Sequence, residues 1–325
     1  MSQSESRRFV FHDFAPTSVS FREEVVRGLS RPRKAIAAKF FYDKEGSRLF
    51  EAICEQPEYY PTRVETSIMQ RYSGEMAELI GPDCLLIEYG SGASRKTRFL
   101  LDAARPAAYV PIDISRAQLL QSAQELSAAY PALNIVAICA DYLQPLPLPD
   151  CSMYRFRRKV VYFPGSTIGN LERGETVEFL RNVREVIGRD GAFLVGVDLK
   201  KSPALLHAAY NDAAGVTAAF NLNLLSRMNR ELGADFDIAA FRHHAFFAPV
   251  AGRVEMHLLS LKPQFAHIGE LAVEFRAGET IHTEISRKYG DEEFHELAAE
   301  VGFVPLKVWI DDAQLFSLHL LSLAA

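Results

Sequence analysis

The sequence is poor in cysteine, has no long hydrophobic run and carries no large excess of either charge. Its 325 residues include four cysteines, at positions 54, 84, 139 and 151, and none of them forms a C-x-x-C pair. This usage favours reduced thiols in a cytoplasmic protein over a disulfide framework. No apolar run approaches the ~18 residues that span a membrane, and no signal peptide follows the polar start of the chain.

Familiar metal-binding and hydrolase signatures are also missing. The chain has no H-E-x-x-H helix, EF-hand loop, zinc-type cysteine set or G-x-S-x-G turn. His243 and His244 are adjacent, so in a strand they would point to opposite faces. We therefore expect no bound metal and no hydrolase chemistry. The net charge of −5 argues against a nucleic-acid binder, and 48% apolar residues are typical of a globular protein.

A glycine-containing turn at 90–92 is the most informative local feature. Three apolar residues, Leu85 to Ile87, indicate a buried strand that leads into Gly90 and Gly92, and a helix is expected from Arg95. Glycines let the backbone approach a ligand that a Cβ would push away, and the start of a helix offers free N–H groups. This arrangement is typical of a nucleotide-binding loop in an open α/β sheet.

The turn departs from the dinucleotide-binding fingerprint. The third glycine of G-x-G-x-x-G is replaced by Arg95, and an acidic residue, Glu88, precedes the first glycine. The resulting E-x-G-x-G resembles motif I of methyltransferases that use S-adenosylmethionine.

Polar residues follow the next strands of the expected sheet. Asp113 closes the strand 107–112, about 20 residues after the glycine turn, where such folds bind ribose hydroxyls. Asp141 follows the strand 133–139, where methyltransferases of this class commonly place an acid for the adenine amino group. Asn170 ends the loop after the strand 159–164, and its amide can donate and accept at once. We expect this loop to face the transferred group.

Periodicity predicts an alternating α/β order from residue 66 onward. The expected helices are 66–80, 95–104, 115–128, 175–187 and 292–301, and the expected strands are 84–89, 107–112, 133–139, 159–164, 192–198, 303–310 and 315–323. Residues 32–39 also look helical, whereas 1–30 look partly irregular. The aromatic segment 40–62 is either a helical pair on the sheet or a cap over a ligand, and periodicity does not decide between them. Residues 201–287 form an insertion with helices over 202–232 and strands near 254–261, 270–276 and 280–288.

These elements predict an α/β protein: a Rossmann-like, class I methyltransferase sheet with a second, discontinuous α+β domain that binds substrate. We assign 64–200 and 288–325 to the cofactor-binding domain, and 1–63 and 201–287 to the substrate-binding cap. The last helix and two-strand hairpin would close the sheet, as in that methyltransferase fold.

Several motifs spread over nearly the whole chain resemble one family, the histidine-specific Nα-methyltransferases of ergothioneine biosynthesis. They are Tyr42-Asp43 with Gly46-Ser47 and Leu49-Phe50, Pro57 to Arg63, Glu88 to Gly92, Phe163 to Asn170, Val254 to Met256, and His282 to Ser286. The resemblance implies conversion of L-histidine to its trimethylammonium betaine, hercynine, with S-adenosylmethionine as methyl donor.

The resemblance also implies roles for individual residues. The α-amine and carboxylate would be held by Tyr59, Asn170 and Tyr210, with Tyr42 and the Gly165 backbone near the amine, so that Tyr42 and Asn170 are the candidate catalytic residues. The imidazole would be held by Glu284 and Ser286, with Met256 close by. The cofactor contacts would come from Tyr42, Gly90, Lys96, Asp113, Asp141 and Tyr142.

The implied chemistry suits these side chains. In-line attack by a neutral amine on a sulfonium carbon needs orientation rather than a protein nucleophile, and an aromatic face such as Tyr59 attracts a cationic sulfonium or trimethylammonium group. Two alternatives stay open: an Nα-methyltransferase for another amino acid or a modified histidine, and a non-catalytic nucleotide-binding protein. We expect a cytoplasmic monomer that binds a small molecule and neither nucleic acid nor membrane.

Overall fold

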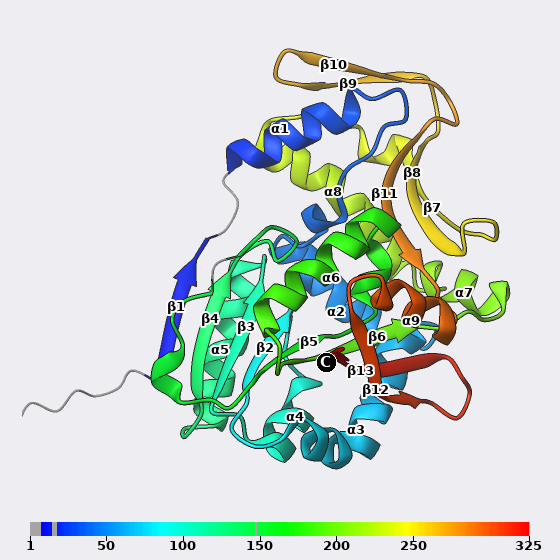
Figure 1. Cartoon of the computed structure of the whole chain (residues 1–325). Helices are drawn as coiled ribbons and strands as arrows, with labels where there is room; N and C mark the ends of the chain where they lie inside the picture. Colours follow the sequence, from blue (N-terminus) through cyan, green and yellow to red (C-terminus); the bar gives the residue numbers. More distant parts are fainter. Residues whose placement is uncertain (1–7, 15–17, 147, 325) are drawn as a thin grey trace, which may run out of the picture.

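The computed structural model describes residues 8–14, 18–146 and 148–324. Its lower part in Figure 1 is a layered α/β unit, and its upper part combines helices α1 (Ser18–Leu29) and α8 (Val216–Leu232) with antiparallel strands. In this view the upper part lies above the α/β unit.

The lower part is built on an eight-stranded sheet of order β1-β4-β3-β2-β5-β6-β13-β12. Pairing is parallel from β1 to β6, and β13 and β12 pair antiparallel at one edge. The strands are β1 (Phe9–Asp13), β4 (Asn134–Cys139), β3 (Ala108–Asp113), β2 (Leu85–Tyr89), β5 (Lys159–Phe163), β6 (Ala192–Asp198), β13 (Phe316–Leu323) and β12 (Phe303–Ile310). The expected Rossmann-like sheet and its closing hairpin are confirmed.

Helices cover both faces of this sheet, which is why its central strands are continuously hydrophobic. One face packs against α6 (Arg173–Ile187) and α9 (Asp291–Ala299). The other packs against α3 (Tyr60–Ile80), α4 (Thr97–Ala104) and α5 (Arg116–Ala129). The strand order reverses between β2 and β5, and ligands bind outside the carboxyl ends of strands at such a switch point.

The N-terminal region differs from expectation in two places. Residues 9–13 form β1, which pairs with β4 in the main sheet, so they do not belong to the cap to which 1–63 was assigned. The helix expected over 32–39 is wrong. The backbone there pairs with the strand at His282 instead, through hydrogen bonds of 2.9 Å from Ile36 N–H to His282 O and from His282 N–H to Lys34 O. Only a 3₁₀ turn, η1 (Ala38–Phe41), follows.

The upper part is an α+β unit with its own hydrophobic core. Its other helices are α2 (Lys44–Cys54) and α7 (Pro203–Tyr210), and its three-stranded sheet has the order β11-β8-β7. The strands are β7 (Phe241–Ala248), β8 (Arg253–Ser260) and β11 (Thr280–Arg287), with a separate hairpin of β9 (Gln264–Ile268) and β10 (Leu271–Phe275). Strands β7 and β9 were missed, and the helical stretch 202–232 is broken between α7 and α8.

Residues from two distant parts of the chain share this core. Side chains from 21–60 pack with side chains from 206–281, and the rings of Phe41 and Phe220 lie 4.5 Å apart between centroids. The aromatic segment 40–62 therefore packs mainly with the inserted α+β elements, and this favours the cap interpretation over a helical pair on the sheet.

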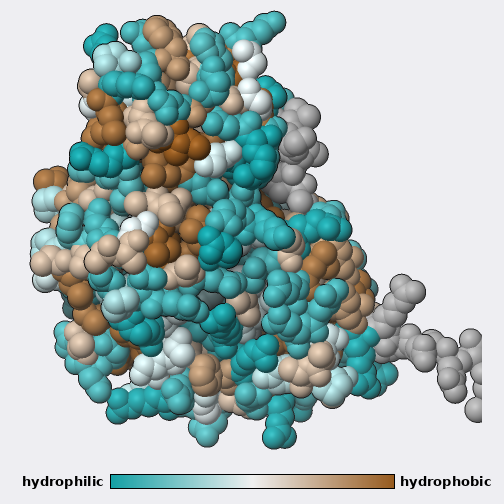
Figure 2. Space-filling model, turned by 180° about the vertical axis from the view of Figure 1, so that it is seen from behind, coloured by the Kyte–Doolittle hydropathy of each residue, from teal (hydrophilic) through white to brown (hydrophobic). Residues whose placement is uncertain are grey.

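Among the described residues, no helix combines the length and apolar character needed to cross a membrane. The face of the molecule in Figure 2 is largely hydrophilic, with hydrophobic residues in scattered patches.

Candidate active site

The glycine turn lies directly after β2, at the point where the strand order reverses. Gly90 and Gly92 have φ angles of 70° and 49°, a left-handed region in which a side chain is strained. The Gly90 N–H donates to the carbonyl of Ile112 over 2.8 Å, which holds the turn against the end of β3. A Cβ at Gly90 would touch the ring of Tyr142 at 3.7 Å. The turn thus exposes backbone beside an aromatic ring.

Asp113 closes β3 next to this turn. One carboxylate oxygen accepts the Gly92 N–H and the other accepts the Ser115 N–H, each over 2.8 Å. Burial raises the pKa of Asp113, and these backbone hydrogen bonds partly offset that effect. Each carboxylate oxygen has a second lone pair, so Asp113 can order the turn and still accept hydroxyl groups of a ligand.

Asp141 and Tyr142 follow β4 at the same edge of the sheet. Asp141 accepts hydrogen bonds of 3.1 Å from Lys39 Nζ and from the Leu143 N–H. Tyr142 stacks on Tyr89 with ring centroids 5.6 Å apart and planes inclined by 7°. Lys39 was not predicted, because its contact with Asp141 joins segments 102 positions apart.

Lys96 is held by a buried carboxylate that sequence reasoning missed. Glu65 on α3 is fully buried, and it accepts hydrogen bonds from Lys96 Nζ, from the Gly165 N–H at 3.0 Å and from the Tyr162 hydroxyl at 3.1 Å. One feature of the sequence could have identified Glu65: it is a glutamate among apolar residues of a helix, just after the motif Pro57 to Arg63. Glu65 thereby joins the loop after β5 to the start of α4.

Glu88, the acidic residue of the glycine motif, lies below the turn. It is 2% exposed and accepts hydrogen bonds from the hydroxyls of Thr97 and Tyr109. Burial raises the pKa of Glu88 to about 7, against the lowering effect of those two donors. Glu88 therefore fixes the beginning of α4 to strands β2 and β3.

The residues at this edge fit a nucleoside cofactor of the S-adenosylmethionine type. The turn has no Cβ at Gly90 and Gly92, the Asp113 carboxylate keeps free acceptor capacity, and the Tyr142 ring offers a flat apolar surface. All lie at the switch point, where nucleotide ligands bind in such sheets.

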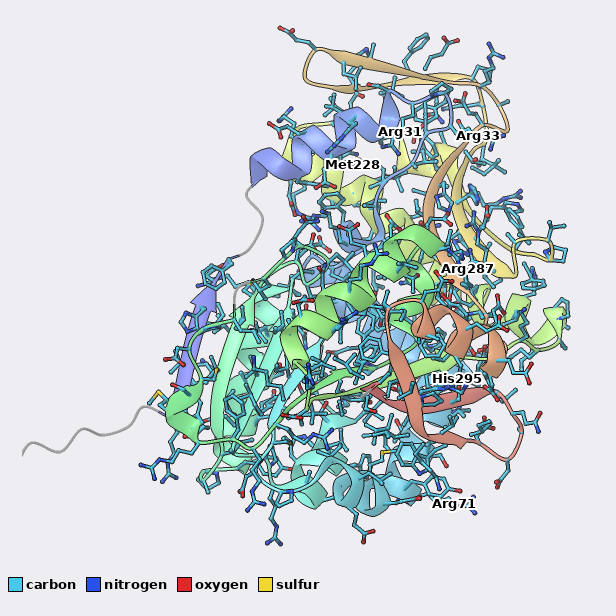
Figure 3. The ribbon with its side chains drawn as sticks, viewed as in Figure 1. Arg31, Arg33, Arg71, Met228, Arg287 and His295 are labelled. Atoms are coloured by element: carbon cyan, nitrogen blue, oxygen red, sulfur yellow. The ribbon has the colours of Figure 1, made fainter. Side chains whose placement is uncertain are left out.

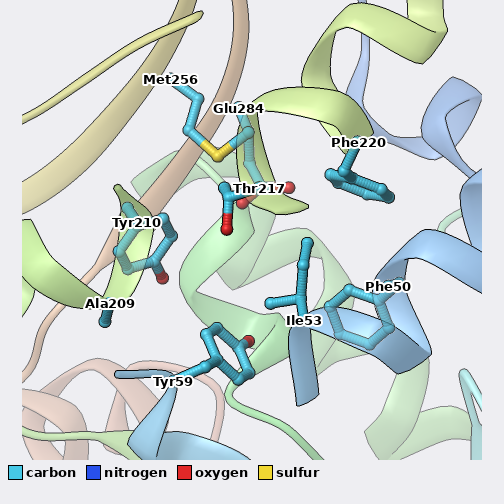
Figure 4. A pocket seen from close by; sticks show the side chains of 9 residues that line it. All are labelled: Phe50, Ile53, Tyr59, Ala209, Tyr210, Thr217, Phe220, Met256 and Glu284. Atoms are coloured by element: carbon cyan, nitrogen blue, oxygen red, sulfur yellow. The ribbon is translucent and has the colours of Figure 1, made fainter. Parts of the chain in front are cut away.

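A pocket opens in the upper part, between the cap helices and the three-stranded sheet (Figure 4). It is lined by Phe50, Ile53, Tyr59, Ala209, Tyr210, Thr217, Phe220, Met256 and Glu284. The structure brings together four predicted residues here: Tyr59, Tyr210, Met256 and Glu284. The other five were missed, although Phe50 and Ile53 belong to the aromatic segment that suggested a cap.

A β-bulge aims Glu284 into this pocket. His282 pairs with His257 and Glu284 pairs with Met256, so the register shifts at Thr283. In a regular strand, the side chains of His282 and Glu284 would point to the same face of the sheet, because they are two positions apart. The bulge between them redirects Glu284 to the other face. The Thr283 hydroxyl donates to Met256 O or Asn221 Oδ1, at 3.0 and 2.9 Å, which secures the bulge. The pKa of Glu284 is raised to about 7, because the effect of burial exceeds the opposing effect of the Lys288 ammonium.

A buried polar cluster lies behind Tyr210. The Ser286 Oγ is 2.6 Å from the Tyr210 hydroxyl and 2.7 Å from Lys288 Nζ. Lys288 also contacts the Tyr210 hydroxyl at 3.0 Å and the Asp198 carboxylate at 2.7 Å. Burial alone would lower the pKa of Lys288, but Asp198 and Tyr210 raise it above its ordinary value, so the ammonium stays charged. Ser286 thus contacts Tyr210 rather than lining the pocket.

The Asp198 carboxylate also accepts hydrogen bonds from Tyr60 at 2.7 Å and from Lys201. The pKa of Lys201 is lowered to about 8, because the effect of burial exceeds the opposing effect of the Asp198 carboxylate. Asp198, Lys201 and Lys288 were not predicted, because no local motif links Asp198 and Lys201 to the distant Lys288.

The remaining predicted residues are Tyr42, Gly165 and Asn170. The Tyr42 ring lies 5.7 and 6.0 Å, between centroids, from the rings of Phe50 and Phe220, which line the pocket. Burial raises the pKa of the Tyr42 hydroxyl. Asn170 is the last residue of the turn η3 (Thr167–Asn170), and Gly165 precedes this turn by two residues.

The turn η3 packs tightly on the end of β11. A Cβ at Gly169 would lie 2.7 Å from the carbonyl oxygen of Arg287, whose position Figure 3 labels. Only glycine allows this approach. The loop that carries Asn170 is therefore fixed against the strand that carries Glu284.

The sheet order, the turn at its switch point and the adjoining pocket define a methyltransferase of the S-adenosylmethionine-dependent class. A model of the family described as "histidine-specific methyltransferase, SAM-dependent" matches residues 21–323. The chain belongs to this family, and S-adenosylmethionine is its cofactor.

Characterised relatives agree with this assignment. The chain is 40% identical to the histidine N-alpha-methyltransferase of Mycolicibacterium smegmatis and 39% identical to that of Mycobacterium tuberculosis, in each case over 93% of this chain and 94% of the relative. It is 29% identical to ergothioneine biosynthesis protein 1 of Neurospora crassa, over 91% of this chain and 34% of that longer protein.

Proposed function

We propose that this protein transfers three methyl groups from S-adenosylmethionine to the α-amine of L-histidine and releases hercynine, a step of ergothioneine biosynthesis. The observation that carries the proposal is the Glu284 carboxylate in a pocket whose other lining residues, apart from Thr217, are apolar or aromatic. An imidazole N–H would give this buried carboxylate a charge-assisted hydrogen bond. The mycobacterial relatives named above support the same substrate.

The amino-acid end of the substrate would be held on the opposite side of the pocket. Tyr59, Tyr210 and Asn170 are assigned to the α-carboxylate and amine, with Tyr42 and the Gly165 backbone near the amine. The position of Lys288 behind Tyr210 supports this orientation, because its hydrogen bond holds the Tyr210 hydroxyl in place. Glu284 holds the ring, with Met256 packed beside it and Ser286 acting through Tyr210.

The cofactor is assigned to Tyr42, Gly90, Lys96, Asp113, Asp141 and Tyr142. When bound, S-adenosylmethionine supplies an electrophilic methyl group on a positively charged sulfur. The protein's part is to orient the neutral amine in line with that methyl group and to exclude competing water. The aromatic rings of the pocket stabilise positive charge on the substrate nitrogen as methyl groups accumulate.

Each transfer forms one N–C bond, breaks one S–C bond and releases one proton overall. Burial raises the pKa of Tyr42 well above its ordinary value, so its hydroxyl stays protonated. Tyr42 can therefore relay a proton from the amine to water but does not act as a standing base. Asn170 would hold the substrate while the amine changes from primary to tertiary.

We further propose the division into a cofactor domain, 64–200 and 288–325, and a cap, 1–63 and 201–287, with Phe9–Asp13 reassigned to the sheet. The shared core of 21–60 and 206–281 supports the cap. We also propose a monomer in the cytoplasm that binds neither nucleic acid nor membrane, and the net charge of −5 supports the absence of nucleic-acid binding.

A related reaction on another amino acid is the second candidate. A purely apolar side chain would leave Glu284 buried without a partner, which costs binding free energy. A modified histidine keeps the imidazole and is compatible with this feature. A non-catalytic nucleotide-binding role would account for the turn at Asp113 but not for Glu284 in the second pocket.

Mass spectrometry of the products tests the proposal. Purified protein with S-adenosylmethionine and L-histidine is expected to yield the trimethylated amino acid, and parallel reactions with tryptophan, phenylalanine and a thiol-substituted histidine define the specificity. Cofactor turnover with one of the other amino acids but not with L-histidine would contradict the proposed substrate. Cofactor binding without any turnover would contradict the enzymatic function itself.

A further inference from the structure

The face of the three-stranded sheet that points away from the pocket carries a row of histidines. His244 on β7 pairs with His257 on β8, and His257 pairs with His282 on β11. Directly opposite residues of neighbouring strands have side chains about 5 Å apart. Glu255 lies two positions before His257 on β8 and therefore shares its face. Three neighbouring strands thus present imidazoles and a carboxylate side by side.

Three of these side chains converge on one point. Glu255, His257 and His282 offer ligand atoms that all lie within 4.8 Å of one another. His257 Nε2 is 3.2 Å from Glu255 Oε2, close to the about 3.3 Å that separates two donors around tetrahedral zinc. The rings of His257 and His282 lie 5.0 Å apart between centroids. A small rotation of His282 would complete the set.

Apart from the contact between His257 Nε2 and Glu255 Oε2, the hydrogen bonds of these two residues go to their outer atoms. The other ring nitrogen of His257, Nδ1, lies 3.2 Å from the Thr280 hydroxyl. The other oxygen of Glu255, Oε1, accepts from Arg253 Nε over 2.8 Å. Metal-binding imidazoles and carboxylates have such outer partners, which fix their orientation. Arg253 opposes a cation by its charge, but it contacts the oxygen that points away from His257.

His282 supplies the observation that points to a ligand. Its Nε2 is among the few side-chain atoms of the described residues that are buried without a hydrogen-bond partner. A buried polar atom without a partner is costly, and in native structures it calls for an explanation such as a bound ion. The backbone of His282 is held on both sides, by β8 and by the segment at Ala35.

We propose that Glu255, His257 and His282 bind a divalent transition-metal ion of the zinc type on the back of the substrate sheet. One carboxylate and two imidazoles form a donor set that suits zinc, and three protein ligands leave the fourth position to water. The exposed fractions of His257 and Glu255, 13% and 17%, leave a path from solvent. This inference does not depend on the proposed reaction.

The metal site would lie on the same two strands as two residues of the substrate pocket. Met256 lies between Glu255 and His257 on β8, and Glu284 follows His282 on β11 after the bulge. A metal ion bound across the two strands would hold β8 against β11 and so fix the positions of Met256 and Glu284. The ion would act as a structural clamp behind the pocket and would not contact the substrate.

Calorimetric titration with zinc chloride tests the site. The protein should be full-length and free of any histidine tag, and L-histidine should be left out because it chelates metals. We expect one zinc ion per chain for the parent. His282→Gln and Glu255→Gln each remove a ligand, so the affinity should fall by more than about 100-fold, and Thr280→Val should lower it about 10–100-fold by freeing His257 Nδ1.

His267→Ala is the matched control. His267 is an exposed histidine that contacts a carboxylate, Asp235, at 2.9 Å. Among the described residues, this pair belongs to no group of three side chains that could bind a metal ion. This variant should bind zinc as the parent does. The proposal is overturned if the parent binds no stoichiometric zinc, or if Glu255→Gln and Thr280→Val, which keep both histidines, bind it as tightly as the parent.

Discussion

Lys288 donates a hydrogen bond from its ammonium group to the hydroxyl of Tyr210 over 3.0 Å, and both side chains are buried. The ammonium is balanced by Asp198 on β6, a strand of the main sheet. Tyr210 lines the substrate pocket. A charge compensated in the α/β unit therefore orients a hydroxyl in the pocket, and Lys288 is a positioning residue for substrate binding.

Lys288→Met keeps the length of the side chain and removes its charge. We expect a higher KM for L-histidine and an unchanged Kd for S-adenosylmethionine, because the variant disturbs Tyr210 but not the glycine turn. Steady-state kinetics and calorimetry measure the two quantities. Lys200→Met is the control, since the exposed Lys200 pairs with Glu293 and should leave both unchanged. An unchanged KM in Lys288→Met would refute the positioning role.

The same variant should lose stability. Removing one partner of a buried ion pair leaves an uncompensated charge and typically costs about 3–5 kcal/mol. Lys201 also contacts Asp198, so we expect the lower end of that range. Urea unfolding of the parent, Lys288→Met and the Lys200→Met control measures this loss.

Asp113→Ala should weaken cofactor binding. The carboxylate holds the Gly92 N–H and is assigned to the ribose hydroxyls, and a hydrogen bond to a charged group contributes about 1.5–3 kcal/mol. Titration calorimetry should therefore show a Kd for S-adenosylmethionine at least about tenfold higher. Unchanged affinity in a variant with a native circular dichroism spectrum would remove Asp113 from the cofactor site.

Glu284→Ala should raise the KM for L-histidine with little effect on cofactor binding, because it deletes a partner of the imidazole only. Activity towards tryptophan or phenylalanine should rise, since an apolar ring no longer leaves a carboxylate unpaired. Initial rates with the three amino acids measure the change. A variant that methylates L-histidine as efficiently as the parent would mean that the ring is recognised elsewhere.

The pH dependence of stability should report the burial of Glu284. Its pKa is about 7 in the folded protein and near the ordinary value of 4.5 when unfolded, so the unfolded state loses its proton first. Relative to Glu284→Gln, the parent should lose unfolding free energy as the pH rises from about 4.5 to about 7, and the difference should be constant above that. Urea unfolding at several pH values tests this, and a parallel course for both proteins would contradict it.

Dimethylhistidine should bind more tightly than L-histidine. Each added methyl group removes an N–H donor but gains contact with aromatic rings such as Tyr59, while the anchor on the carboxylate is unchanged. Competition binding with the unmethylated, monomethylated and dimethylated amino acids measures the order. If affinity falls steadily with each methyl group, the aromatic side chains are only a cover over the pocket.

Local patterns in the sequence were sufficient to determine the main sheet apart from β1, the glycine turn and the carboxylates at its edge. Each depends on residues within a few positions of one another, on buried strands that are apolar throughout, and on glycines where the backbone must turn. The motif around Glu284 is local in the same sense. The pairing of residues 34–36 with His282 is not, and this is why the helix expected over 32–39 was wrong.

Only the tertiary structure decided which side chains share a site. Lys288 and Tyr210 are 78 positions apart, Glu65 and Gly165 are 100 apart, and the bulge at Thr283 separates the pocket face from the histidine face of one strand. Such contacts depend on how elements pack and on strand register. A register shift of one residue would move every side chain of a strand to the other face of the sheet. The sequence by itself therefore determined the framework and its glycine turn, whereas long-range packing determined the shape of the pocket and the charges behind it.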